Sequence, residues 1–335
     1  MRQICDNVEP PYYAIRLSAR RRSAVRPKGK QARAAVKRLS ASRAGGRGAS
    51  TGKERGHIVS NVRNDLRLGM PDSLAPLEIE AKVEEVGVGK VGMAVSKVLV
   101  LAVLAGAFIA FGGMYFCIFL GDATMPFAVQ RAVGGLCFCL GLVLVLCCGA
   151  ELFTGNSLII CAKASGKVGW AAMLKNWALV WLGNLAGALL AVALIYLAQV
   201  WSMNGGAVGE AMVSVAAGKV SPAWMTLFFK GIMCNIFVCL AVWIGFSART
   251  VVDKVIGIIL PISAFVAAGF EHCVANMFFL PMGCLLSSMG VGAPGAVPFE
   301  SILYNLSAAT LGNIVGGLLV GLAYWFVFGQ KKVGK

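Results

Sequence analysis

Two histidines occur in the chain, and only His272 lies beside long apolar stretches. Ionisable side chains at membrane depth are costly and mark substrate or proton pathways, and imidazole changes its charge near neutral pH. A structural histidine that donates to a backbone carbonyl is the alternative. We favour a functional role, in which His272 handles a proton or a polar solute inside a membrane.

Two glutamates recur in one short pattern, G-x-E-x-x-x-x-N, as Glu151 and Glu271. A carboxylate at a helix break can accept hydrogen bonds from the backbone amides that the break frees. We therefore interpret both as loop-stabilising residues, and a direct role in proton transfer is the alternative. Thr154 and Asn235 either line the path or tie helices together. Lys219 is an isolated charge in a polar connection, and by itself this position predicts only a solvated loop lysine.

The elements that hold these residues are membrane-spanning helices. Of the 335 residues, 58% are hydrophobic and 14% are charged, whereas soluble domains have about 25% charged residues. This composition excludes an ordinary soluble globule. The net charge of +16 belongs mainly to residues 1–69, which hold 17 Lys and Arg against 4 Asp and Glu.

Residues 1–69 have too few apolar side chains to offset the entropy of folding, so we expect a disordered basic extension. A polybasic arm for anionic lipid or nucleic acid is the alternative, and we expect no specific nucleic-acid partner. The functional protein is expected to begin at Met70. Residues 70–93 predict an amphipathic helix at the membrane surface, with Glu80 and Glu84 on its polar side. Residues 331–335 form a short basic tail.

Residues 94–330 predict six membrane-spanning units, each long enough to cross about 30 Å of hydrocarbon. The uncharged stretches are 98–121, 132–150, 176–209, 231–248, 255–270 with 273–299, and 301–330. The second and fifth units are interrupted, at Glu151 and at Glu271. Lysines and arginines gather in the connections after the second and fourth units and at the C-terminus, which predicts that both termini are cytoplasmic.

The two halves of this region resemble each other. Residues 149–156 match 269–276, and residues 183–190 match 312–319 even more closely. Interrupted spans at corresponding positions of inverted repeats point to a binding site at the bilayer midplane. The predicted fold is therefore an all-α integral membrane protein with two inverted three-helix repeats.

Other classes of protein fit the sequence poorly. The cysteines lack the paired CxxC spacing of a zinc site, so we expect no metal and no cofactor. An intramembrane protease would need paired aspartates or a Ser–His couple, and no HExxH motif occurs. We therefore expect that the protein is not an enzyme. A water or glycerol pore would carry Asn-Pro-Ala at both breaks, and a pure membrane scaffold leaves His272 without a role.

Several segments resemble the signatures of the formate/nitrite transporter family. The segments are 124–127 (TMPF), 149–156 (GAELFTGN), 162–167 (AKASGK), 175–177 (KNW), 269–272 (GFEH) and 275–277 (ANM). The match runs from about residue 76 to 328. The resemblance implies an aquaporin-like protomer of six spans with its own pore, assembled as a homopentamer in the plasma (inner) membrane.

The resemblance also implies roles for individual residues. His272 is similar to the family's central pore histidine and Thr154 to its threonine at the break of span two. Lys219 and Asn313 resemble its vestibule lysine and the asparagine partner of that lysine, and Asn235 lies beside the constriction. The apolar constriction positions are matched by Phe138, Leu142, Leu152, Phe153, Phe265 and Val238.

The expected substrate is a small monovalent anion of a weak acid. Residues 270–272 and 278–283 look like formate members, whereas Glu151 is more frequent in nitrite and hydrosulfide members, so those two anions remain alternatives. A bare anion in an apolar constriction costs tens of kcal/mol by Born estimates. Protonating a carboxylate of pKa about 4 at pH 7 costs only roughly 4 kcal/mol. We therefore expect transient protonation of the anion near His272.

Overall fold

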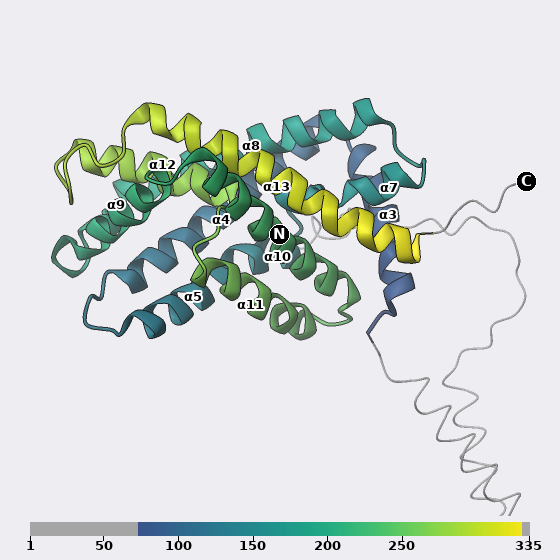
Figure 1. Ribbon diagram of the computed structural model, residues 1–335, viewed down its shortest axis with the longest axis horizontal. Helices are drawn as coiled ribbons and strands as arrows, with labels where there is room; N and C mark the ends of the chain where they lie inside the picture. The colour runs from purple at the N-terminus through teal and green to yellow at the C-terminus, as the bar shows by residue number, and fades with distance from the viewer. Residues whose placement is uncertain (1–72, 330–335) are drawn as a thin grey trace, which may run out of the picture. The chain divides into compact units, whose positions relative to one another are not determined.

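The computed structural model describes residues 73–329, and this part of the chain is all helical (Figure 1). The predicted extension, residues 1–69, and the predicted tail, residues 331–335, lie outside the described residues. The helices are α3 (Pro76–Val91), α4 (Val95–Leu120), α5 (Phe127–Cys148), α6 (Phe153–Asn156), α7 (Ile159–Ala164), α8 (Trp170–Leu197), α9 (Ala207–Val220), α10 (Trp224–Ser247), α11 (Val251–Ala267), α12 (Cys273–Ser288) and α13 (Phe299–Phe328).

Five of the described helices are long and apolar enough to cross a membrane. They are α4, α5, α8, α10 and α13, with 22 to 30 residues each. At 1.5 Å per residue even the shortest spans about 33 Å, which exceeds the roughly 30 Å of hydrocarbon. The shorter α11 and α12 together occupy the place of the fifth predicted unit. The predicted interruptions are confirmed, because α5 ends at Cys148 and α11 ends at Ala267.

The two halves pack in the same way. Helix α4 contacts α5 and α8, and α10 likewise contacts α11 and α13. Small residues permit these close approaches. A Cβ atom on Gly187 of α8 would overlap the carbonyl oxygen of Val103 in α4, and one on Gly316 of α13 would overlap that of Ile232 in α10. The internal repeat seen in the sequence is therefore also a repeat of helix packing.

The two breaks begin with the same backbone device. Gly149 caps α5 with φ 79°, and Gly269 follows α11 with φ 70°. A left-handed residue after the last helical turn is usually glycine, because a side chain is strained there. Each glycine ends the first half of its span and turns the chain into the three residues that precede the next helix.

The N-terminal helix α3 is docked onto other helices. Pro76 occupies the first helical position, and the Glu78 carboxylate accepts a hydrogen bond from the Ala75 backbone N–H at 2.9 Å. The helix contacts α7, α8, α10 and α13. Ile79 and Val83 are buried, as their apolar character predicts.

The prediction that Glu80 and Glu84 lie on the polar side of α3 is wrong. They are only 0% and 1% exposed. The Glu84 carboxylate binds the side chains of Ser165 and Lys167, which offsets the cost of burying its charge. Burial and the neighbouring Glu84 raise the pKa of Glu80 to about 7. The polar character of these two side chains was therefore not enough to predict which face of α3 is buried.

Candidate functional site

His272 occupies the N-cap of α12, directly after the second break. Its Nδ1 accepts a hydrogen bond from the Ala275 backbone N–H at 3.0 Å, and its Nε2 lies 2.9 Å from the Thr154 hydroxyl. A nitrogen that accepts carries no proton, so this geometry fits a neutral imidazole with its proton on Nε2. The predicted pair of His272 and Thr154 is thus in direct contact, and it joins the two broken spans.

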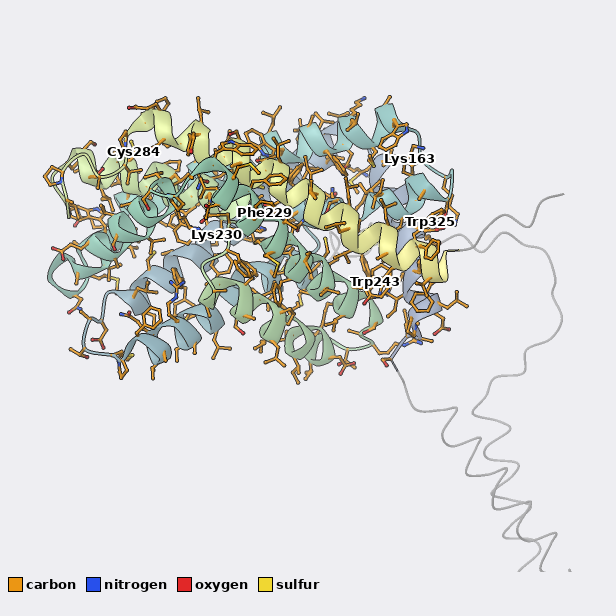
Figure 2. All side chains as sticks on the ribbon, viewed as in Figure 1. Lys163, Phe229, Lys230, Trp243, Cys284 and Trp325 are labelled. Atoms are coloured by element: carbon orange, nitrogen blue, oxygen red, sulfur yellow. The ribbon has the colours of Figure 1, made fainter. Side chains whose placement is uncertain are left out.

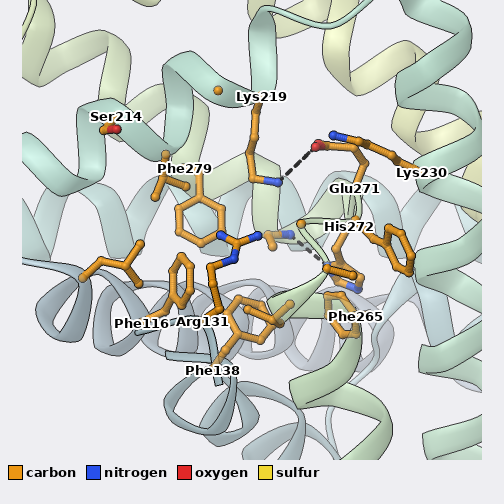
Figure 3. A pocket seen from close by; sticks show the side chains of 18 residues that line it. Phe116, Arg131, Phe138, Ser214, Lys219, Lys230, Phe265, Glu271, His272 and Phe279 are labelled. Carbon is orange, nitrogen blue, oxygen red and sulfur yellow. Dashed lines mark hydrogen bonds and ion pairs between the residues drawn. The ribbon is translucent and has the colours of Figure 1, made fainter. Parts of the chain in front are cut away.

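Two cavities meet at His272. The larger has a volume of about 320 Å³ and extends from His272 past Glu271 to Lys219 (Figure 3). We call it the Lys219 vestibule. The smaller, of about 10 Å³, shares Phe138, Phe265 and His272 with the vestibule and holds no more than one water-sized probe. Its lining residues are Ile109, Phe138, Leu142, Leu152, Val238, Ile262, Phe265 and His272.

Five of the six predicted constriction residues line the small cavity. The rings of Phe138 and Phe265 stand edge to face with centroids 5.9 Å apart, and that of Phe265 stacks on the His272 imidazole at 6.0 Å. Phe153 is not among the lining residues, and its ring packs against Trp177. The small cavity at His272 is therefore narrow, and aromatic rings form part of its wall.

Asn235 ties helices together in the protein interior. Its amide nitrogen donates to the carbonyl oxygens of Thr154 and Asn313 and to the Ser157 hydroxyl. The side chain is fully buried, and its amide oxygen has no hydrogen-bond partner among the described residues. Of the two roles that the sequence left open, these bonds correspond to the tie between helices.

Lys219 belongs to a polar cluster at the second break. It lies in the last turn of α9, and its Nζ is 3.3 Å from both carboxylate oxygens of Glu271. The same carboxylate accepts from the side-chain amides of Asn276, at 2.6 Å, and Asn305, at 3.2 Å. Asn305 also donates to the Lys219 carbonyl oxygen at 2.7 Å.

The first break carries the corresponding cluster, with Lys90 in place of Lys219. The Lys90 Nζ is 2.7 Å from the Glu151 carboxylate, which accepts from Asn156 at 2.7 Å. Asn156 in turn donates to Asn176 at 2.9 Å. Lys90 was not predicted as a partner of Glu151, because it lies in α3 and outside the repeated segments. The matching patterns around Glu151 and Glu271 could have prompted a search for a second lysine.

Asn184 and Asn313 hold the backbone of the two breaks. The Asn313 amide oxygen accepts from the Cys273 N–H at 2.9 Å, and its nitrogen donates to the carbonyls of Glu271 and Gly231 at 2.8 Å each. Asn184 forms the same three bonds with Phe153, Glu151 and Ala102.

This placement differs from two expectations. The asparagine in contact with Lys219 is Asn305, whereas Asn313 binds backbone atoms. The Glu271 carboxylate binds the side chains of Lys219 and Asn276, and it stabilises its break through these contacts. The described residues contain no cluster of three potential metal ligands.

Comparison with known proteins identifies relatives along most of the chain. Residues 77–326 match the model of the family described as formate/nitrite transporter. The formate channel FocA of Escherichia coli K12 is 41% identical over 271 residues, which cover 77% of this chain and 95% of that protein. A probable formate transporter of Methanothermobacter thermautotrophicus is 39% identical over 253 residues, 69% of this chain and 89% of that one.

Solved structures give the same result for the fold. One, described as a pentameric formate channel with formate bound, superimposes with a TM-score of 0.66 at 38% identity and covers 70% of this chain and 98% of its own. Another, an FNT family ion channel, gives a TM-score of 0.64 at 29% identity, with coverage of 75% and 98%.

Proposed function

The chain belongs to the formate/nitrite transporter family, and on that premise we propose that it forms a membrane pore for small monovalent anions of weak acids, with formate as the first substrate. Transport is assigned to residues 94–330. The observation that carries the proposal is that two unlike cavities share His272 in their walls. One is wide and has three cations in its lining, and the other is aromatic and nearly closed.

The constriction favours passage of the neutral acid. The aromatic and aliphatic walls around Phe138 and Leu142 offer an anion no compensating charge, and a bare ion there costs tens of kcal/mol by idealised estimates. Protonating formate at pH 7 costs about 4 kcal/mol. The cheaper route is therefore for the anion to gain a proton at the vestibule end of the constriction and to cross as formic acid.

His272 acts in this scheme as a neutral hydrogen-bond donor. Its Nδ1 is occupied by the Ala275 N–H, so Nε2 carries the proton and faces Thr154. A neutral imidazole that gave up this proton would become an anion, so the proton on formate comes from water in the vestibule. His272 and Thr154 hold the carboxyl group in place while the proton is exchanged.

We propose a homopentamer in the plasma membrane, with both termini cytoplasmic. Large apolar side chains are exposed on α8, α11 and α13, among them Leu182, Leu260 and Phe326. Such faces suit contact with lipid or with neighbouring copies. The pentameric channel among the structural relatives supports the assembly, and Lys163 and Lys167 after the second span support the orientation.

Uptake into proteoliposomes tests the proposal. The full chain is reconstituted, and the initial uptake rates of formate, nitrite and hydrosulfide are compared with those of empty vesicles between pH 5 and 8. We expect formate uptake well above the empty-vesicle rate and faster at low pH. A higher rate for nitrite or hydrosulfide would reassign the substrate within the family, and no uptake of any of the three would contradict the proposed function.

A further inference from the structure

The Lys219 vestibule carries more positive charge than its visible ion pair explains. Three cationic side chains, Arg131, Lys219 and Lys230, and one carboxylate, Glu271, line it, which leaves a formal charge of +2. Within residues 73–329, Lys219 is the one of these cations that forms an ion pair, with Glu271 at 3.3 Å. The pair is neutral as a whole, so the excess positive charge resides on Arg131 and Lys230.

Arg131 is held in a fixed position at the vestibule wall. Its Nε donates to the carbonyl oxygen of Ala267, at the end of α11, at 2.9 Å. A Cβ atom on Gly269 would lie 2.8 Å from Nη2, so the guanidinium rests against the break three residues before His272. Figure 3 shows the Arg131 and Lys219 side chains entering the same pocket from opposite walls. In the described part of the chain the Nη atoms have no hydrogen-bond partner.

Lys230 approaches the same break from another helix. It lies in α10, where its carbonyl oxygen accepts from the Glu271 N–H at 3.4 Å, and its side chain lines the vestibule. Figure 2 places it toward the middle of the helical unit, whereas Lys163 lies at the α3 end. Two cations on α5 and α10 therefore face one cavity that leads to His272.

We propose that Arg131 and Lys230 form an anion-capture subsite in the Lys219 vestibule, which binds a small monovalent carboxylate before it reaches His272. The planar guanidinium offers paired N–H donors that match a carboxylate, and the ammonium adds a point charge. In this scheme the Lys219–Glu271 pair shapes the break and does not supply the attracting field. The inference rests on the proposed function.

Transport kinetics test the subsite in the reconstituted full chain. Initial formate uptake is measured against formate concentration at two ionic strengths for the wild type, Arg131→Gln, Lys230→Gln and the double variant. Loss of one vestibule charge is expected to raise the half-saturating concentration about threefold, and loss of both about tenfold. Maximal flux does not fall. The half-saturating concentration depends less on ionic strength, because the electrostatic attraction that salt would screen has been removed.

Two further variants separate charge from structure. Lys163→Gln removes a cation at the other end of the unit and keeps the wild-type concentration dependence. Arg131→Lys keeps the charge and retains most of the dependence on ionic strength. Wild-type half-saturation and salt dependence in the double variant would overturn the proposal, as would a fall in maximal flux alone.

Chemical labelling tests binding without transport. Phenylglyoxal modifies arginine, and peptide mass spectrometry follows Arg131 in the reconstituted protein. We expect formate to slow this labelling, and to slow it less in Lys230→Gln. Equal labelling with and without formate, or an Arg131 shielded by lipid under both conditions, would refute the subsite. A protein that takes up no anion but shows this protection contradicts the proposed function and leaves the subsite standing.

Discussion

Replacing Asn313 by alanine tests whether one side chain holds the second break. The amide accepts from the Cys273 N–H and donates to the carbonyls of Glu271 and Gly231, and it is 0% exposed. Removing it leaves three buried backbone groups unpaired, each costing about 1–3 kcal/mol. Allowing for relaxation, we expect the free energy of unfolding to fall by about 3–6 kcal/mol, which is a large fraction of the stability of a typical domain.

The buried thiols supply the assay. Cys273 follows the break and is buried, so a thiol-reactive dye labels it only when the protein opens. The detergent-solubilised protein is heated with the dye, and Asn184→Ala serves as the matched variant because Asn184 forms the same three bonds at the first break. Both variants should open at clearly lower temperatures than the wild type. A decrease of less than about 1 kcal/mol in the free energy of unfolding of either variant would refute the idea that these amides hold the breaks.

Three further predictions concern packing, pH and selectivity. Gly187→Ala forces α8 away from Val103 and should cost about 1–3 kcal/mol in thermal unfolding. Glu80 keeps its proton up to a pKa of about 7 in the docked α3. The docking of α3 onto its neighbouring helices is therefore strongest below the ordinary carboxyl pKa and weakens as the pH rises through 7. At pH 8, Glu80→Gln should protect the α3 amides from hydrogen exchange better than the wild type does, by about 1–2 kcal/mol after discounting for solvent screening. Phe138→Ala widens the constriction and should raise acetate uptake relative to formate about tenfold.

Each of these predictions has a matched control. Gly89→Ala adds the same methyl group where nothing lies within 4 Å, so it should not destabilise the protein. For Glu80→Gln, equal protection of α3 at pH 6 and pH 8 in the wild type would contradict the argument. For Phe138→Ala, the empty-vesicle rate of acetate uptake is subtracted, and unchanged selectivity would show that this ring does not set the width.

Periodicity, charge and the internal repeat were enough to predict the helical membrane fold. The long uncharged stretches specify the spans, because hydrocarbon thickness leaves few alternatives. The repeated G-x-E-x-x-x-x-N pattern located both breaks, and the glycine of each pattern ends the preceding helix with a positive φ. The contact between His272 and Thr154 follows from these two breaks meeting at one depth.

The polar partners of the breaks were harder to predict from sequence. Lys90 reaches Glu151 across 61 positions of the chain, and the buried Glu84 carboxylate is bound by Lys167 from the connection between α7 and α8. Such pairs depend on how helices dock, and no local pattern encodes that. Asn305 was missed for the same reason, since its partner Lys219 lies on another helix. The resemblance named Asn313, whose contacts are with backbone atoms at the break.

We propose that the anion crosses as the neutral acid, so its transport carries no net charge. The most direct test is formate uptake into proteoliposomes whose membrane potential is clamped by a potassium gradient and valinomycin, with a pH-sensitive dye inside. We expect uptake above the empty-vesicle rate that is independent of the potential and delivers one proton per formate. Uptake that follows the potential and leaves the internal pH unchanged would show that the bare anion crosses, and would refute passage of the neutral acid.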